Sequence, residues 1–324
     1  MIRPALRHFF FVITLITSTA FMLYCMTDVF GGTVIEHPQT ARQPEVKWAS
    51  TDISRLPVTI NHDQGRLGNK LFKYASLLGI ARSNGRVPVV GPYVDGVNLA
   101  GIFNLSHVDP TLNAKDWMEI NETNYAERDD RFMSLPPRPV KVHGYVQSWR
   151  YFYNIRDEIR REFQLQERYR QEAQTWRSSI LDSARYNAAT LVAVHVRMRD
   201  EFSNPNTTEA PPSFYTNAFN TMRALLPGAR LLFIVTGNNL QWCQDNLQAE
   251  DVLVLQPDTP EVHFSFLSVC DHGIVSAGTF GWWAAWLTGG HVVYYKRFPI
   301  PESYEAIGFV AEHYYPPSWI PVDH

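Results

Sequence analysis

The stretch Thr190-Leu-Val-Ala-Val-His-Val-Arg-Met-Arg-Asp200 joins an apolar run to a polar tail. Its apolar part is typical of a parallel-sheet strand, because such strands are buried on both faces and carry nearly continuous hydrophobic residues. The polar side chains then lie at the carboxyl end of the strand, where open α/β sheets bind ligands: His195, Arg197, Arg199 and Asp200. A guanidinium at this position suits the oxygens of a pyrophosphate. The alternative interpretation is an Arg–Asp ion pair that only closes the strand end.

Strands and helices keep alternating from this stretch to the end of the chain. The pattern predicts helices over 213–226, 240–247, 261–270 and 280–287, and further strands over 230–235, 252–255, 273–276 and 292–295. Alternation of this kind favours a parallel, doubly wound α/β sheet.

The part of the chain before residue 188 follows the same plan less regularly. It predicts strands over 57–61, 87–90 and 140–144, a helix over 69–83, irregular chain over 98–137, and a long, charge-rich helix over 151–185. We therefore expect two Rossmann-like domains, residues 57–187 and 188–324, that face each other across a cleft.

The composition is that of an ordinary globular protein. The chain has 324 residues, of which 45% are hydrophobic and 19% charged, and a net charge of −3. This length allows one large or two medium domains. No nucleic-acid partner is expected, because binding to nucleic acid requires a basic surface.

The N-terminus carries a candidate membrane segment. Residues 9–26 contain no charged side chain and follow Arg3 and Arg7. As a helix they would span about 27 Å, close to the thickness of an internal membrane of the secretory pathway. A cleaved signal peptide is the less favoured alternative, because the run exceeds a usual signal core and no clear Ala-x-Ala site follows it. We expect a cytoplasmic tail over 1–8, an uncleaved signal-anchor over 9–26 and a lumenal stem over 27–56.

Either interpretation places the rest of the chain in the lumen or outside the cell. Asn-x-Ser/Thr triplets at Asn104, Asn121 and Asn206 agree with this placement and predict N-glycosylation. Cys243 and Cys270 are the only lumenal cysteines, and in an oxidising compartment they form either a disulfide or two buried thiols. No metal is assigned to the site, and a zinc site is not expected because the three cysteines of the chain have no histidine at ligand spacing.

Three other turns between strands and helices carry residues suited to a ligand. The first, Gly65-Arg-Leu-Gly-Asn69, has glycines that let a ligand approach the backbone, and it opens a helix whose N-terminus favours anions. In the second, Ser276-Ala-Gly-Thr-Phe280, the Thr279 hydroxyl and the following N–H groups hold a phosphate, or Thr279 only caps the helix. In the third, Asn238 reads a base edge or simply makes a turn.

Together these motifs resemble one family, the galactoside α-1,2-fucosyltransferases of glycosyltransferase family eleven. Residues 65–75 are similar to the Gly-Arg-Leu-Gly-Asn opening of that family, and His195–Asp200 to its His-Val-Arg-Arg-Gly-Asp motif. Residues 235–243 and 270–290 are similar to its second and third motifs. The resemblance runs from about residue 58 to the end of the chain.

This resemblance implies a GT-B-like fold and a single-pass type II enzyme of the Golgi membrane. Such an enzyme moves L-fucose from GDP-fucose to the 2-hydroxyl of a terminal galactose and inverts the anomeric carbon. No cofactor or essential metal is implied. The partners would be GDP-fucose, a galactose-terminated glycan on a glycoprotein or glycolipid, and the membrane that holds the N-terminal helix.

The motif residues receive roles from this resemblance. Arg197 would stabilise the charge that departing GDP leaves on its β-phosphate, with Thr279 and Phe280 as second donors. The remaining residues expected at the donor are Arg66, Gly68, Asn69, His195, Arg199 and Asn238.

An inverting transfer also needs a base for the acceptor hydroxyl. Asp200 is the residue we expect in this role, although it could instead hold Arg197 in place. Glu201 and Glu209 are the alternatives for the base.

The chain departs from the family motif where Met198 replaces its second arginine and Arg199 replaces its glycine. On an extended segment Arg197 and Arg199 share one face, so Arg199 could supply the missing charge. Two other functions therefore stay open beside α-1,2-fucosyl transfer. One is a fucosyltransferase of another linkage or acceptor, and the other is a catalytically silent protein that binds a glycan or a nucleotide.

Overall fold

The structure, a computed structural model, describes residues 52–61, 65–91, 98–199 and 207–324. All of them belong to one compact unit, Trp48–His324. The predicted membrane segment lies outside these residues, as do Asp200, Glu201 and Asn206. Within the described ranges, no helix is long and apolar enough to cross a bilayer.

The larger sheet has six strands, all parallel, in the order β10-β9-β8-β5-β6-β7. Its strands are β5 (Thr190–Val196), β6 (Leu231–Gly237), β7 (Val252–Val254), β8 (His272–Val275), β9 (Val292–Tyr295) and β10 (Ile320–Val322). This is the strand order of dinucleotide-binding folds. The predicted parallel α/β sheet is confirmed, and β10 is an edge strand that the sequence analysis missed.

The helices that connect these strands lie on both faces of the sheet. The helices are α5 (Pro212–Leu225), α6 (Leu240–Asn246), α7 (Pro260–Ser268) and α8 (Thr279–Thr288). On one face α5 meets α6, with the rings of Tyr215 and Trp242 5.8 Å apart. On the other face α7 meets α8, with the rings of Phe264 and Phe280 5.3 Å apart.

This arrangement decides between the two alternatives for the cysteines. Cys243 lies in α6 and Cys270 just after α7, so the sheet separates them. Both are buried free thiols. The structure therefore shows two buried thiols and no disulfide between these residues.

The smaller sheet is also parallel, in the order β2-β1-β4-β3. Its elements are β1 (Pro57–Ile60), α2 (Leu67–Ser83), β2 (Val87–Pro88), β3 (Met118–Asn121) and β4 (Val140–His143). β3 lies in the segment for which we expected irregular chain. It is a short and mostly exposed strand, so it lacks the hydrophobic alternation that identifies a half-buried strand.

The long helix predicted over 151–185 is wrong in one respect, because the chain breaks between α3 (Arg156–Glu162) and α4 (Glu167–Leu181). At the break the Gln166 N–H donates to the Ile102 carbonyl, at 2.7 Å between N and O. The Phe163 ring lies 5.4 Å from that of Phe103. A tertiary contact thus overrides local helix propensity at this point.

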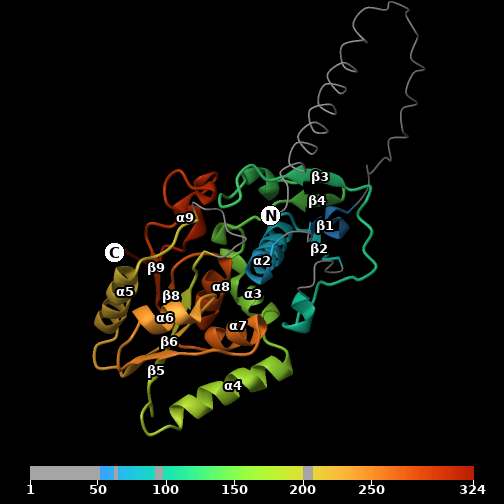
Figure 1. Cartoon of the computed structure of the whole chain (residues 1–324). Coiled ribbons are helices and arrows are strands. Elements are labelled where there is room, and N and C mark those ends of the chain that lie inside the picture. Colours follow the sequence, from blue (N-terminus) through green and yellow to red (C-terminus); the bar gives the residue numbers. More distant parts are fainter. Residues whose placement is uncertain (1–51, 62–64, 92–97, 200–206) are drawn as a thin grey trace, which may run out of the picture. The chain divides into compact units, whose positions relative to one another are not determined.

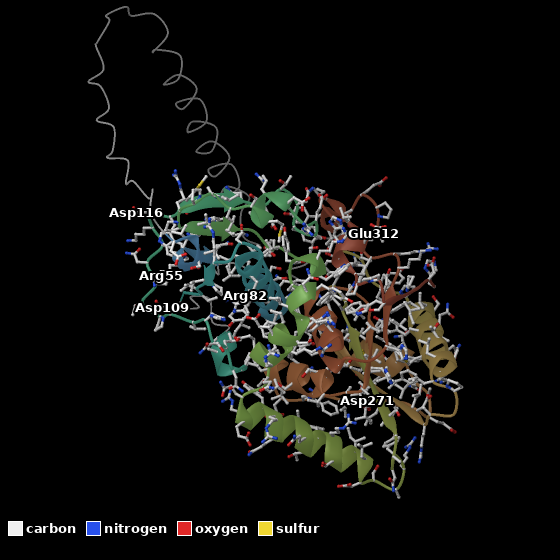
Figure 2. The ribbon with its side chains drawn as sticks, turned by 180° about the vertical axis from the view of Figure 1, so that it is seen from behind. Arg55, Arg82, Asp109, Asp116, Asp271 and Glu312 are labelled. Carbon is white, nitrogen blue, oxygen red and sulfur yellow. The ribbon has the colours of Figure 1, made fainter. Side chains whose placement is uncertain are left out.

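The remaining short elements connect these layers. They are η1 (Ile53–Arg55), η2 (Leu99–Gly101), η3 (Asp130–Met133), η4 (Trp149–Tyr151), η5 (Tyr153–Ile155), η6 (Tyr304–Ala306) and α9 (Ala311–Tyr314). On the surface, Arg82 of α2 pairs with Glu158 of α3, at 3.1 Å between Nε and Oε1 (Figure 2).

The two sheets share a core, because α2 packs directly against α8 (Figure 1). The Phe72 ring of α2 lies 4.6 Å from Trp282 and 5.1 Å from Trp283 of α8. Phe152 stacks on Trp283 at 5.3 Å. Aromatic side chains therefore fill the space between the sheets beneath the ends of both helices.

Candidate functional site

The site begins where β5 and β8 lie side by side, although the chain continues from β5 to β6. The strand order reverses here, and open α/β sheets bind ligands at such a point. Ser276, directly after β8, fixes the two strand ends. Its hydroxyl accepts the Arg197 backbone N–H, at 3.0 Å between N and Oγ, and donates to the His195 carbonyl, at 3.1 Å between the oxygens.

The turn after β8 opens α8 beside Arg197. Gly278 is the N-cap and adopts a φ of +78°. A Cβ at Gly278 would lie 4.0 Å from the Arg197 Cγ, so the arginine side chain passes close to the helix start. No side chain caps α8, and the N–H groups of a first helical turn have no acceptor inside the helix.

The alternative in which Thr279 only caps this helix is wrong. Thr279 is the first residue of α8 rather than its N-cap. Its hydroxyl donates to the Asn69 Oδ1, at 2.8 Å between the oxygens. The glycine before it takes the capping position because the backbone there requires a positive φ, which glycine adopts without strain.

The start of α2 lies against the start of α8. A Cβ on Gly68 would lie 2.4 Å from the Thr279 carbonyl carbon and 2.6 Å from the Phe280 nitrogen. Arg66 is the N-cap of α2, is exposed, and provides no side-chain cap. Because helix N-termini carry partial positive charge and unpaired N–H groups, two of them beside Arg66 and Arg197 form a candidate anion-binding site (the anion site).

Asn69 ties three parts of the chain together at this place. Its Oδ1 accepts from the Thr279 hydroxyl of α8 and from the Gln147 Nε2, at 3.1 Å, in the turn after β4. The amide therefore links the two sheets at the edge of the anion site.

His195 lies beneath the first turn of α8. Its ring is 4.8 Å from that of Phe280, and a Cβ on Gly281 would lie 2.8 Å from its Nδ1. Burial lowers the pKa of His195 to about 3, with smaller contributions from the charges of Arg197 and His263. The imidazole is therefore neutral near neutral pH, and it packs against the helix instead of adding charge.

Asn238 holds the loop that follows β5. Its Oδ1 accepts the Met198 N–H and its Nδ2 donates to the Met198 carbonyl, each at 2.8 Å between N and O. The Met198 side chain packs against the hydrophobic core. Both polar groups of the Asn238 amide are thus engaged with backbone, and its contact with a base stays a prediction.

Arg199 turns toward Glu209. The Glu209 carboxylate accepts the Arg199 backbone N–H, at 2.6 Å, and forms an ion pair with its side chain, at 3.2 Å between Nε and Oε2. Arg199, which replaces the glycine of the family motif, therefore has an acidic partner of its own in Glu209. Asp200 and Glu201 lie outside the described residues, so the identity of the base stays a prediction.

The sequence analysis missed residues that hold the site through backbone contacts. Ser276 is of this kind, and so is Glu122, whose carboxylate accepts two consecutive backbone N–H groups in the turn after β4. Gln147 was also missed, and it bonds to the Asn69 side chain instead. Ser276 stood within a quoted motif, but nothing in the sequence indicated that its hydroxyl bonds to residues 195 and 197. Among the described residues, no group of three His, Cys, Asp or Glu side chains could hold a metal ion.

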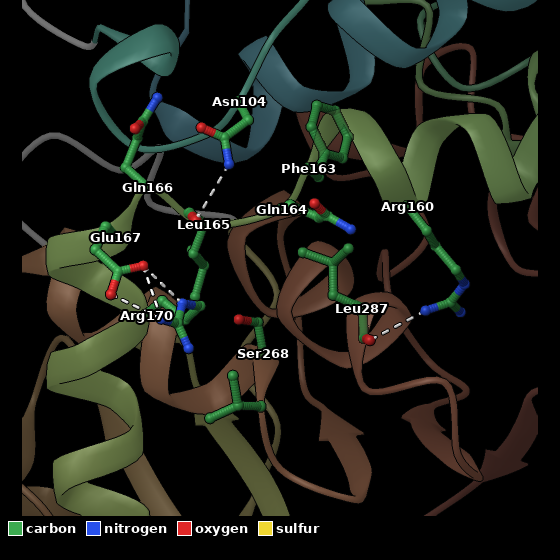
Figure 3. A pocket seen from close by; sticks show the side chains of 11 residues that line it. Asn104, Arg160, Phe163, Gln164, Leu165, Gln166, Glu167, Arg170, Ser268 and Leu287 are labelled. Atoms are coloured by element: carbon green, nitrogen blue, oxygen red, sulfur yellow. Dashed lines mark hydrogen bonds and ion pairs between the residues drawn. The ribbon is translucent and has the colours of Figure 1, made fainter.

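A pocket of about 600 Å³ lies at the other end of α8 (Figure 3). Leu287 lines it, eight residues after Thr279, which is about 12 Å along the helix. Asn104, one of the predicted glycosylation sites, also lines it, with its Nδ2 3.5 Å from the Leu165 carbonyl oxygen. This pocket is separate from the anion site.

Comparison with known proteins gives relatives along most of the chain. The model of Glycosyl transferase family 11 matches residues 32–323. The chain is 35% identical over 277 residues to galactoside alpha-(1,2)-fucosyltransferase 2 of Oryctolagus cuniculus, covering 81% of this chain and 75% of that one. It is 31% identical over 316 residues to galactoside alpha-(1,2)-fucosyltransferase 1 of Homo sapiens, covering 88% and 81%.

Solved structures share the fold at lower identity. A structure of the α-1,6-fucosyltransferase NodZ soaked with GDP-fucose aligns with a TM-score of 0.53 and 14% identity, over 74% of this chain and 95% of that one. A structure of fucosyltransferase NodZ from Bradyrhizobium gives a TM-score of 0.51 and 14% identity, over 71% and 91%. The fold is thus an α/β fold with parallel sheets, of the GT-B-like kind. With a family model over nearly its whole length and a relative above 30% identity, the chain belongs to glycosyltransferase family 11.

Proposed function

We propose that this chain transfers L-fucose from GDP-fucose to the 2-hydroxyl of a terminal galactose, with inversion at the anomeric carbon. The observation that carries the proposal is the meeting of the α2 and α8 N-termini beside Arg197, at the reversal point of a parallel sheet. Membership of family 11 and relatives named galactoside alpha-(1,2)-fucosyltransferases support the donor, the acceptor and the linkage.

The chemistry requires the protein to stabilise GDP as a leaving group. When the bond between fucose and the β-phosphate breaks, negative charge grows on the phosphate oxygens. We propose that the Arg197 guanidinium and the N–H groups at Thr279 and Phe280 stabilise that charge. The bond by which Ser276 holds the Arg197 backbone beside this turn supports the assignment. These fixed positive groups can provide the charge that a divalent metal would otherwise supply, so we propose that no essential metal is needed.

Inversion requires a base on the side of the sugar opposite to the leaving group. We propose Asp200 for this role. Glu209, the alternative among the described residues, already accepts two contacts from Arg199. Its carboxylate is therefore already occupied by Arg199, which leaves it less able to meet an acceptor hydroxyl.

We also propose that residues 9–26 anchor the chain in the Golgi membrane with the catalytic part in the lumen. The uncharged run after Arg3 and Arg7 supports this placement. Expressed in secretory-pathway cells, the full chain should then carry N-glycans at Asn104, Asn121 and Asn206. An amidase that removes N-glycans should increase its gel mobility, and a chain without any glycan would contradict the lumenal placement.

The activity is tested with the full chain, GDP-fucose and a panel of terminal galactosides. We expect GDP release together with a product fucosylated at O2 of galactose. Arg197→Ala should reduce turnover by about 10²–10³-fold, the range for loss of one group that stabilises transition-state charge. Arg223→Ala, which removes a surface arginine paired with Asp251, is the matched control and should retain turnover.

The other outcomes separate the remaining functions. A product with another linkage would correct the acceptor position while keeping the donor chemistry. Nucleotide binding without transfer to any galactoside would indicate a silent binding protein. Full activity of Arg197→Ala would overturn the assigned role of Arg197.

A further inference from the structure

The turn after β4 has an unusual backbone for its sequence. Val146 is fully buried and adopts a φ of +46°, a region that is costly for a β-branched residue. Consecutive backbone N–H groups in such a turn point in one direction and form a small anion-binding concavity. Something must therefore hold this turn in place.

The Glu122 carboxylate occupies that concavity. Its Oε1 accepts the Tyr145 N–H at 2.5 Å and its Oε2 accepts the Val146 N–H at 2.7 Å. Gly144 leaves room for it, because a Cβ there would lie 2.2 Å from the Glu122 Cδ. A carboxylate that uses both oxygens on a strained turn fixes the direction in which the next residue points.

The next residue is Gln147, which is 6% exposed. Its Nε2 donates to the Asn69 Oδ1 at 3.1 Å, and the same oxygen accepts from the Thr279 hydroxyl at 2.8 Å. Contacts therefore run without a gap from Glu122 through the turn to the first residue of α8.

We propose that Glu122 is a positioning residue for the nucleotide-sugar site, acting through the turn at residues 144–147, through Gln147 and through Asn69. The inference rests on the proposed function, since it assigns Glu122 to the donor side of that reaction. In this proposal Glu122 acts through these residues and not by contact with donor or acceptor.

The bond pattern requires Glu122 to be ionised, because a protonated carboxyl would turn an O–H toward one of the two N–H groups. The charged and titratable groups around its carboxylate are Lys73, Asp129 and Tyr151, and its backbone N–H donates to the carbonyl of His143. Burial raises the pKa of Glu122 to about 7, against the opposing effects of its backbone hydrogen bonds and of Lys73. Hydrogen bonds from Arg131 lower the pKa of Asp129 to about 2, and burial raises the pKa of Tyr151, so neither of these changes charge near neutrality.

The test compares Glu122→Gln with wild type in the full chain. The amide keeps one acceptor but presents an NH₂ to the other N–H, so we expect faster hydrogen exchange over residues 144–148. We also expect the Kd for GDP-fucose to rise about tenfold, the effect of losing roughly one hydrogen bond to a charged group. The kcat at saturating donor should change less than about twofold, because Glu122 does not contact the reacting atoms.

The pH profile gives a readout that a purely structural role would not move. On acidification from pH 8 to pH 6, the Kd of wild type should rise toward that of Glu122→Gln, while the Kd of the variant stays nearly flat. His143 is present in both proteins, so the difference between the profiles isolates Glu122.

A second variant tests the route. Gln147→Leu removes the donor to Asn69 but leaves Glu122 on the turn, so the Kd should rise about tenfold without faster exchange at residues 145 and 146. The double variant with Glu122→Gln should have nearly the same Kd as either single variant, because both substitutions interrupt the same chain of contacts. Asp109→Asn is the matched control, since Asp109 also accepts a backbone N–H, from Thr111, at the surface (Figure 2).

Each outcome decides a separate point. An unchanged exchange rate in Glu122→Gln, or faster exchange with unchanged Kd, overturns the inference. Fully additive effects of the two substitutions overturn the route through Gln147. If wild type binds neither GDP nor GDP-fucose, the proposed function fails and the donor part of this inference fails with it. The exchange measurement still decides whether Glu122 holds the turn.

Discussion

Three of the polar side chains that hold the site bond to backbone rather than to other side chains. Ser276 bonds to residues 195 and 197, Asn238 to Met198, and Glu122 to Tyr145 and Val146. Each of these side chains bonds directly to backbone groups, so it sets the position of a loop closely. The position of Arg197 therefore depends on its neighbours. Substitutions of those neighbours should lower donor affinity by displacing Arg197 and its loop.

Asn238→Ala tests whether Asn238 only holds the loop after β5 or also contacts the guanine base. Removing the amide breaks both hydrogen bonds to Met198, so the loop after β5 loosens and the affinity for any nucleoside diphosphate falls, by about tenfold. We expect the inhibition constants of GDP and ADP to rise in parallel when fucose transfer is assayed. A selective loss for GDP, with ADP unchanged, would show that Asn238 contacts guanine.

Glu122 should also make stability depend on pH. Its pKa is raised by burial to about 7 from a usual 4.5, so the folded state holds the proton more tightly than the unfolded state. The stabilisation from this proton is complete below pH 4.5 and is lost as the pH rises through 7. Relative to Glu122→Gln, wild type should lose about 3 kcal/mol of unfolding free energy over that interval. Urea unfolding at pH 4.5, 6 and 7.5 measures the difference, and a constant offset between the two proteins contradicts the expectation.

At the scale of elements, the site depends on how closely the starts of α2 and α8 approach each other. Gly68 allows this approach, because any side chain there meets the backbone of Thr279 and Phe280. The same contact brings two helix N-termini together at the candidate anion site. The geometry of the anion site is therefore a property of a pair of helices, one from each sheet.

Gly68→Ala tests this pairing. Helix propensity favours alanine by about 1 kcal/mol, but the added methyl would lie 2.4 Å from the Thr279 carbonyl carbon. Separation of the helix starts should raise the Kd for GDP-fucose at least tenfold, or about 1.4 kcal/mol. Gly79→Ala, later in α2, meets the Tyr151 backbone instead, so it should lower stability without changing the Kd of the folded protein. Equal donor affinity in wild type and Gly68→Ala would show that the two helix starts need not touch.

The helices and strands also show how much of the fold could be predicted from the sequence. Hydrophobic runs and turn residues located every strand of the larger sheet except β10, and with them the position of Arg197 at a strand end. They did not find β3, which is exposed, or the break after Phe163, which a contact with Phe103 imposes. The hydrogen bonds of Asn69, Ser276 and Glu122 join residues far apart in the chain, and no local pattern encodes such contacts.

At the scale of the whole molecule, the two sheets are joined by more than the aromatic contacts of α2 and α8. Arg160 of α3 donates to the carbonyls of Trp286 and Leu287, at 3.0 and 3.1 Å between N and O, and its guanidinium lies 4.5 Å from the centre of the Trp286 ring. It satisfies the last carbonyls of α8, where a positive charge also interacts favourably with the helix dipole.

Arg160→Ala should therefore lower stability by about 2 kcal/mol, the cost of leaving helix-end carbonyls without their charged donor. The anion site lies at the other end of α8, so the Kd for GDP-fucose should change less than about twofold. Urea unfolding and nucleotide titration of the same samples measure both quantities. A large loss of affinity would mean that α8 transmits strain along its whole length.

The shared core also predicts how the described part of the chain unfolds. Phe72 and Phe152 from the first half surround Trp282 and Trp283 from the second, and all four are fully buried. Separating the halves would expose these rings to water, at about 2–3 kcal/mol for each large side chain. We therefore expect one cooperative transition, with tryptophan fluorescence and far-ultraviolet circular dichroism changing at the same urea concentration. A fragment of residues 188–324 should fail to fold alone, since it would expose Trp282 and Trp283. Two separate transitions, or a folded fragment, would show that each sheet is stable by itself and that the contact between α2 and α8 serves the site alone.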